Sequence, residues 1–158
     1  SGQADGVLTG GCLSLLAALA GTEWALPWTG ASILLIEDVD EPPYKIHRML
    51  TQLRDSQSLR DVKGIIFGTM AKCAADPADG FTLEEVVLDA LKGFEGPIAM
   101  GLAAGHSPEP MLTLPLGTRV VLAPEEPKQG DTGKPDRLAG RLHLTELGVT
   151  EEAVELDE

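Results

Sequence analysis

The sequence predicts an α/β protein, in which short strands alternate with helices along the chain. Three observations favour this class: compact runs rich in Val, Ile and Leu, intervening segments with apolar residues at helical spacing, and Gly or Pro at several junctions. No internal repeat is present. The 158 residues fit one domain, because a chain of this length buries roughly two-thirds of its unfolded surface. We therefore expect a single soluble unit over residues 1–158.

The first half of the chain predicts a helix, a strand and a second helix. Residues 12–20 are small and apolar and stop at Gly21, which predicts a short buried helix with no exposed face. Residues 31–36 form a β-branched and leucine-rich run before an acidic loop, as expected for a strand covered on both sides. A helix should begin near Tyr44, after two prolines. Its predicted buried stripe consists of Ile46, Met49, Leu50 and Leu53.

The second half continues the alternation. Residues 64–67 predict a strand, which a loop over residues 69–81 follows. Thr82 and Glu85 form a capping box, so a helix should begin there and end at Gly93. The remaining expected segments are a strand at 97–102, a loop at 103–110, a strand at 119–122, a polar connection at 124–137 and an edge strand at 138–144.

The charge balance excludes some classes of partner. Twenty-five acidic and twelve basic residues give a net charge of -13, which opposes binding to nucleic acids and to anionic lipid surfaces. We therefore expect no nucleic acid partner and no membrane association. The acids near the end of the chain predict a solvated tail.

Cysteine usage and the start of the chain bear on its origin. Cys12 and Cys73 are too few for a disulfide framework, and no signal peptide or spanning segment is recognisable, so we expect a cytoplasmic protein. The first three residues lack an initiator Met, and we expect the chain to be part of something longer.

Two residues at predicted strand ends could carry chemistry. Glu37 follows the strand at 31–36, and His106 lies in the loop after the strand at 97–102. Loops at the carboxyl ends of strands often hold reacting groups, and a carboxylate can orient a histidine that acts as a base. Structurally, Glu37 could instead cap the helix at Tyr44 and His106 could bond to backbone. The spacing alone favours that structural interpretation. We expect structural roles for His47 and His143 as well.

A nucleophile is missing from the pattern. The chain contains no G-x-S-x-G elbow, and residues 105–109 match only its first half. Residues 10–14 could form half of a cysteine elbow, but no strand is expected to lead into them, so Cys12 is interpreted as a buried structural residue. Three scattered histidines and unpaired cysteines offer no zinc ligand set, and we expect no metal and no cofactor. The acids near Asp38 and Asp40 could bind a cation only weakly.

Several segments together resemble a known family. These are residues 10–16 (GGCLSLL), 21–22 (GT), 36–41 (IEDVDE), 44–50 (YKIHRML) and 101–106 (GLAAGH). In this order and spacing they resemble the C-terminal domain of the serine L,D-carboxypeptidases of the muramoyl-tetrapeptide type, a family that includes the microcin C immunity peptidases. The likeness covers about residues 6–122. Cys12 stands where the family usually has Asn, and His47 where it usually has Asp.

The resemblance implies a fold, a site and a partner. The fold is a swivelling β/β/α domain, the C-terminal catalytic half of the enzyme, in which residues 124–158 match nothing in the family. The relay glutamate and histidine are Glu37 and His106, whereas the serine belongs to an N-terminal nucleophile domain that this chain lacks. The chain alone should therefore be inactive. We expect the complete enzyme to be a homodimer.

The implied reaction is hydrolysis of a peptide bond to a C-terminal D-amino acid, with D-alanine released from murein tetrapeptide during peptidoglycan recycling. The serine attacks the carbonyl, His106 takes and returns its proton, and Glu37 orients the ring. Two alternatives stay open. One is an immunity-type peptidase that cleaves an acyl-adenylate mimic, and the other is a mobile carrier domain that accepts a phosphoryl group on His106.

Overall fold

The computed structural model describes residues 2–25, 30–106, 111–124 and 140–144. Over these residues the chain forms one six-stranded sheet with the strand order β4-β3-β2-β1-β5-β6. Its strands are β1 (Ala4–Cys12), β2 (Ser32–Val39), β3 (Val62–Ala71), β4 (Ile98–Ala99), β5 (Arg119–Pro124) and β6 (Gly140–Leu144). The helices are α1 (Leu13–Leu19), α2 (Pro43–Asp55) and α3 (Leu83–Ala90), with a 3-10 turn at Pro77–Asp79. Strands β1 to β4 are parallel, whereas β5 and β6 are each antiparallel to the preceding neighbour in the sheet.

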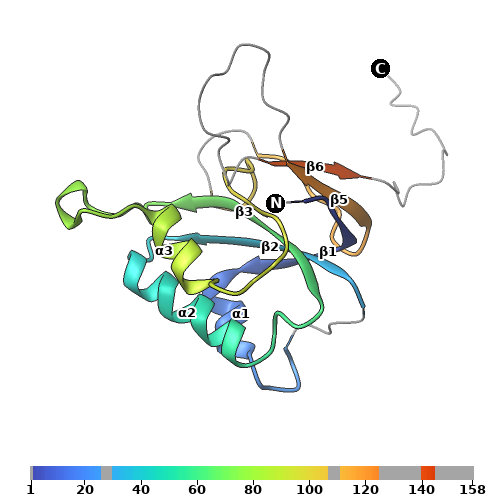
Figure 1. Cartoon of the computed structure of the whole chain (residues 1–158), viewed down its shortest axis with the longest axis horizontal. Coiled ribbons are helices and arrows are strands. Elements are labelled where there is room, and N and C mark those ends of the chain that lie inside the picture. The colour runs from blue at the N-terminus through green and yellow to red at the C-terminus, as the bar shows by residue number, and fades with distance from the viewer. Residues whose placement is uncertain (1, 26–29, 107–110, 125–139, 145–158) are drawn as a thin grey trace, which may run out of the picture.

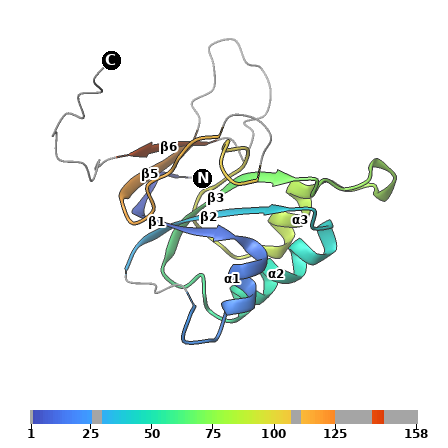
Figure 2. The same cartoon turned by 180° about the vertical axis from the view of Figure 1, so that it is seen from behind.

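The helices and the last two strands lie on opposite sides of the central strands (Figures 1 and 2). Two buried clusters result. Leu34 and Ile36 of β2 belong to the cluster beneath the helices, whereas Ile33 and Leu35 belong to the cluster that contains Val120 of β5. The alternation follows from the pleat, which turns successive side chains to opposite faces. The single sheet curls, so that β5 and β6 cover the face of the central strands opposite the helices, which makes the predicted β/β/α architecture. The α/β class is confirmed.

Strand β1 was not expected from the sequence, which predicted no strand before Cys12. The segment lacks a long apolar run because it is rich in glycine, yet Ala4 and Leu8 are buried. The glycines allow a close approach to β2, since a Cβ atom at Gly6 would lie 2.8 Å from the carbonyl oxygen of Ala31. Pairing with β2 on one side and β5 on the other supplies the hydrogen bonds that make this segment a strand.

Three strands differ most in extent from the predicted ones. β2 runs to Val39 rather than ending at residue 36, and β3 extends through Ala71 into the predicted loop. Both extensions carry polar or small residues, so apolar runs marked only the buried centre of each strand. The strand expected at 97–102 is much shorter, because only Ile98–Ala99 pair with β3.

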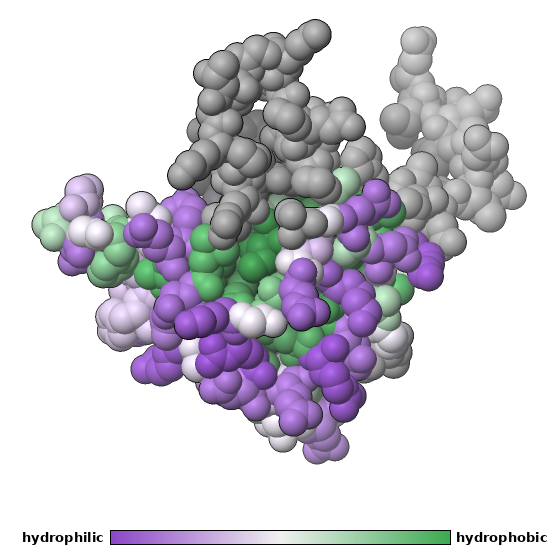
Figure 3. All heavy atoms as spheres, in the orientation of Figure 1, coloured by the Kyte–Doolittle hydropathy of each residue, from purple (hydrophilic) through white to green (hydrophobic). Residues whose placement is uncertain are grey.

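The two longer helices match the sequence prediction, except that α3 ends at Ala90 and not at Gly93. All four stripe residues of α2 are buried, and α2 contributes them to the helix-side cluster. Thr82 Oγ1 accepts a hydrogen bond from the Glu85 N–H, and Glu85 Oε2 accepts one from the Thr82 N–H, which completes the capping box of α3. The outer faces of α2 and α3 contribute to the mainly hydrophilic surface in the lower part of the view in Figure 3.

Helix α1 differs from the prediction that it has no exposed face. Leu13 and Ala17 are buried, but Leu15 is 63% exposed and Leu19 is 39% exposed. The helix is therefore covered on one side only. An apolar cavity of about 260 Å³ lies beside it, with Trp24 and Leu53 among its lining residues.

Some predicted features lie outside the described residues. These are residues 107–110 of the loop predicted at 103–110, most of the polar connection at 124–137, and the acidic tail. The expected edge strand is confirmed over Gly140–Leu144, because β6 is the last strand of the sheet. None of the helices in the described part of the chain has the length and apolar character needed to cross a membrane.

Candidate active site

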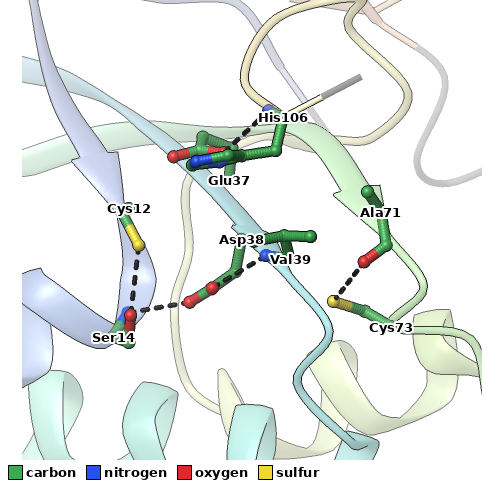
Figure 4. Close-up of polar contacts among 8 residues, drawn as sticks. All are labelled: Cys12, Ser14, Glu37, Asp38, Val39, Ala71, Cys73 and His106. Atoms are coloured by element: carbon green, nitrogen blue, oxygen red, sulfur yellow. Dashed lines mark hydrogen bonds and ion pairs between the residues drawn. The ribbon is translucent and has the colours of Figure 1, made fainter. Parts of the chain in front are cut away.

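Glu37 and His106 meet although they are 69 residues apart in the sequence (Figure 4). His106 Nδ1 lies 2.7 Å from Glu37 Oε2, and the His106 backbone N–H donates to the same oxygen at 3.1 Å. The Glu37 side chain is only 9% exposed, whereas that of His106 is 57% exposed. A carboxylate accepts hydrogen bonds and does not donate them, so this contact assigns the proton to Nδ1 of the neutral ring. Nε2 is then the nitrogen with a lone pair, as a general base requires.

The end of β3 holds the loop that carries His106. The Thr69 N–H donates to the Ala104 carbonyl at 2.7 Å, and Thr69 forms a parallel bridge with Gly105. This places the loop backbone directly against the Glu37 side chain. A Cβ atom at Gly105 would lie 2.5 Å from Glu37 Oε2, and φ at this residue is +110°. Only glycine fits both the conformation and the space, which explains why a glycine precedes His106.

Glu37 lies within β2 and not in a loop after it. The sheet register pairs it with Cys12, the last residue of β1. The alternative role for Glu37, a cap for α2, does not match the structure, because the N-cap of α2 is Pro42 and no side chain caps that helix. The partner of the carboxylate is instead the histidine.

Glu37 raises the pKa of His106 above the ordinary value of 6.5. The largest cause is the hydrogen bond from the ring to the Glu37 carboxylate, and the next is the negative charge of that carboxylate. Desolvation acts in the opposite direction, and the charge of Asp38 adds a smaller rise. The site therefore stabilises the imidazolium, which is the form that a base reaches after it accepts a proton.

An NMR titration of the chain should place the protonation midpoint of His106 above 6.5. Glu37→Gln should lower this midpoint, because the amide keeps the shape of the side chain but removes its charge. Glu84→Gln makes the same chemical change on the exposed surface of α3 and should leave the midpoint where it is. A His106 midpoint that does not respond to Glu37→Gln would show that the contact does not form in solution.

The junction between β1 and α1 lies next to Glu37 in the sheet. Cys12 is half-buried and not fully buried as predicted, and its Sγ lies 3.1 Å from Ser14 Oγ. The Ser14 N–H donates to Asp38 Oδ2 at 2.8 Å (Figure 4). A strand does lead into this segment, contrary to the prediction. However, φ and ψ of Cys12 are -66° and 124°, which is ordinary extended backbone and not the strained turn of a nucleophile elbow.

The sequence predicts structural roles for the two other histidines, His47 and His143. His47 Nε2 lies 2.9 Å from Asp89 Oδ2 and links α2 to α3 at the surface. The side chain of His143 lies outside the described residues. Cys73 is buried, its thiol donates to the Ala71 carbonyl, and burial raises its pKa. Within the described residues no group of three or more His, Cys, Asp or Glu side chains could hold a metal ion.

Residues 5–122 match the LD-carboxypeptidase C-terminal domain family, and the chain belongs to this family, as its resemblance predicted. A Streptomyces coelicolor protein named as a carboxypeptidase is 41% identical over 121 residues, which are 77% of this chain and 37% of that protein. The microcin C7 self-immunity protein MccF of Escherichia coli is 32% identical, over 77% of this chain and 35% of that protein.

A solved structure shows the same likeness. The muramoyltetrapeptide carboxypeptidase of Oxalobacter formigenes matches with a TM-score of 0.69 and 33% identity, over 78% of this chain and 43% of that chain. The chain thus spans less than half of the length of these relatives, from 35% to 43%.

Proposed function

We propose that this chain supplies Glu37 and His106 of a Ser-His-Glu relay in a serine L,D-carboxypeptidase. The observation that supports this proposal is the 2.7 Å contact between a buried carboxylate and an exposed imidazole. The contact occupies Nδ1 and leaves Nε2 as the nitrogen that can serve a serine hydroxyl. The serine belongs to an N-terminal domain that is not in this chain, and that domain is its main partner.

The geometry supports the following sequence of steps. Nε2 of His106 takes the proton of the serine hydroxyl while the serine oxygen attacks the carbonyl carbon of the substrate. The imidazolium then gives this proton to the departing amine of the D-amino acid, and a water repeats the cycle to release the acyl group. Glu37 stays ionised throughout, holds the tautomer and stabilises the imidazolium.

The proposed substrate is a murein tetrapeptide, from which the enzyme releases D-alanine in the cytoplasm during peptidoglycan recycling. The names of the relatives support this choice. Glu37 and Asp38 both place negative charge near the His106 ring. Negative charge here would repel the free carboxylate at the substrate terminus. We expect backbone N–H groups or a basic residue of the N-terminal domain to bind that carboxylate.

A second candidate is an immunity-type peptidase, which the similarity to MccF favours. Its substrate would be an aminoacyl adenylate mimic instead of a cell wall peptide. The surroundings of His106 favour less the alternative of a carrier domain that accepts a phosphoryl group on this histidine. A carrier histidine receives an anionic group, and both Glu37 and Asp38 place negative charge beside the ring.

A comparison of two peptides tests the proposed function. The full-length homodimer that we expect should release D-alanine from a tetrapeptide ending in D-Ala and leave the C-terminal amide of the same peptide almost untouched, because the amide lacks the recognised charge. This chain alone should cleave neither and should not react with a fluorophosphonate probe. Mass spectrometry reports all of these outcomes. Equal cleavage of both peptides would contradict a carboxypeptidase, and preferred cleavage of an aminoacyl sulfamoyl adenosine would identify the second candidate.

A further inference from the structure

Asp38 follows Glu37 directly but faces the opposite side of β2. Glu37 points to the loop of His106, whereas Asp38 points to the helical side and contacts the start of α1 (Figure 4). The sequence predicts that Asp38 lies in an acidic loop that could bind a cation weakly. In the structure it is only 2% exposed, so it belongs to the interior of the domain.

Two backbone N–H groups satisfy the Asp38 carboxylate. Oδ2 accepts from the Ser14 N–H and Oδ1 accepts from the Val39 N–H, each at 2.8 Å. A buried carboxylate needs such donors, because an ionised group without them would lose a large hydration energy. The side chain thereby connects the end of β2 to the first turn of α1.

The β2–β3 ladder is irregular at this point. Ile36 pairs with Phe67 and Asp38 pairs with Met70, so the register shifts across Glu37. The extra residue lies on β3, because Gly68 and Thr69 together oppose Glu37, and it locally disrupts the hydrogen bonds between the two strands. The orientation of Glu37 therefore depends on contacts outside that ladder. Asp38 supplies two of them one residue away.

We propose that Asp38 is a positioning residue, which fixes the end of β2 so that the Glu37 carboxylate stays directed at His106 Nδ1. This inference rests on the relay function proposed for Glu37 and His106. The negative charge of Asp38 also favours the imidazolium. Glu37 and Asp38, both on β2, are the titratable groups that act on the His106 ring among the described residues.

Nitrogen-15 NMR of the chain tests this role without any need for turnover. Above its protonation midpoint, wild-type His106 should hold mainly the Nδ1–H tautomer, because Glu37 accepts that proton. Asp38→Asn should move His106 toward a mixture of tautomers and lower its protonation midpoint. Asp40→Asn is the matched control. Asp40 is exposed, and its positive φ of 59° suits Asn equally well.

A second pair of variants addresses the case in which Asp38→Asn does not fold. Ser14→Pro removes the N–H that binds Asp38 at a first-turn position that tolerates proline, and Ser14→Ala keeps that N–H but removes the hydroxyl. Ser14→Pro should shift the His106 tautomer and Ser14→Ala should not. A wild-type tautomer and midpoint in both Asp38→Asn and Ser14→Pro would overturn the proposal and leave Asp38 with a purely structural role. A His106 that lacks the Nδ1–H tautomer in the wild type would instead contradict the proposed relay.

Discussion

His106→Ala in the full-length enzyme is expected to lower turnover by about 10⁴-fold or more. The substitution removes the base that activates the serine, and the remaining groups of such a site act only as a unit. Because the His106 side chain is 57% exposed, its removal should leave the fold intact. Glu37→Gln should also lower activity substantially. The amide can donate a hydrogen bond to Nδ1 of His106 and so favour the wrong tautomer of the ring. Steady-state release of D-alanine, with circular dichroism for folding, measures both effects.

His47→Ala provides the control for this prediction. His47 is also partly exposed and pairs with Asp89 on the helical side, so its loss should cost about 1 kcal/mol of stability at most and little activity. Equal turnover of wild type and His106→Ala would end the relay hypothesis. An equal loss in His47→Ala would show that the assay reports stability and not chemistry.

Gly105→Ala is expected to lower turnover by about 10²-fold, because a misplacement of roughly 1 Å in a catalytic group has this effect. The new methyl group would lie 2.5 Å from Glu37 Oε2 and would have to push the carboxylate or the His106 loop aside. The value of kcat should fall more than KM changes, since the relay acts in the chemical step. Steady-state kinetics of the full-length enzyme gives both constants.

Gly101→Ala separates this clash from backbone strain. Its φ is +89°, close to the +110° of Gly105, but open space surrounds the position of its Cβ atom. Both substitutions should destabilise the domain by about 1–2 kcal/mol through their positive φ. Only Gly105→Ala should damage the relay. Similar turnover in the two variants would mean that the close approach of Gly105 to Glu37 is not needed.

The two longer helices could be predicted well because their signals are local. The stripe of α2 and the capping box of α3 are fixed by residues three or four positions apart. Strand β1 could not be predicted in this way. It is a central strand rich in glycines and small residues. Its hydrogen-bond partners are β2 on one side and β5 on the other, and β5 lies more than a hundred residues further along the chain. Pairing partners of this kind override local preference.

The candidate site was predictable in part. Glu37 and His106 could be identified as a pair only through the family resemblance, because nothing local relates two residues 69 positions apart. The register of β2 explains the rest. Alternation places Glu37 on the face of Leu35 and Asp38 on the face of Ile36, so the adjacent carboxylates have different partners. A strand limited to residues 31–36 would leave both acids in a loop, where the alternation of a strand does not separate them.

Glu37 and His106 belong to one rigid unit, since the same oxygen binds both the ring and the backbone N–H of His106. If the serine lies on a separate domain, as we propose, a hinge motion between the domains changes only the distance from the serine oxygen to Nε2. The contact between Glu37 and His106 would persist without rearrangement when the two domains move apart. Closure of the domains would then control when the reaction starts. It would bring His106 Nε2 to the serine hydroxyl, which is not activated while the two groups are apart.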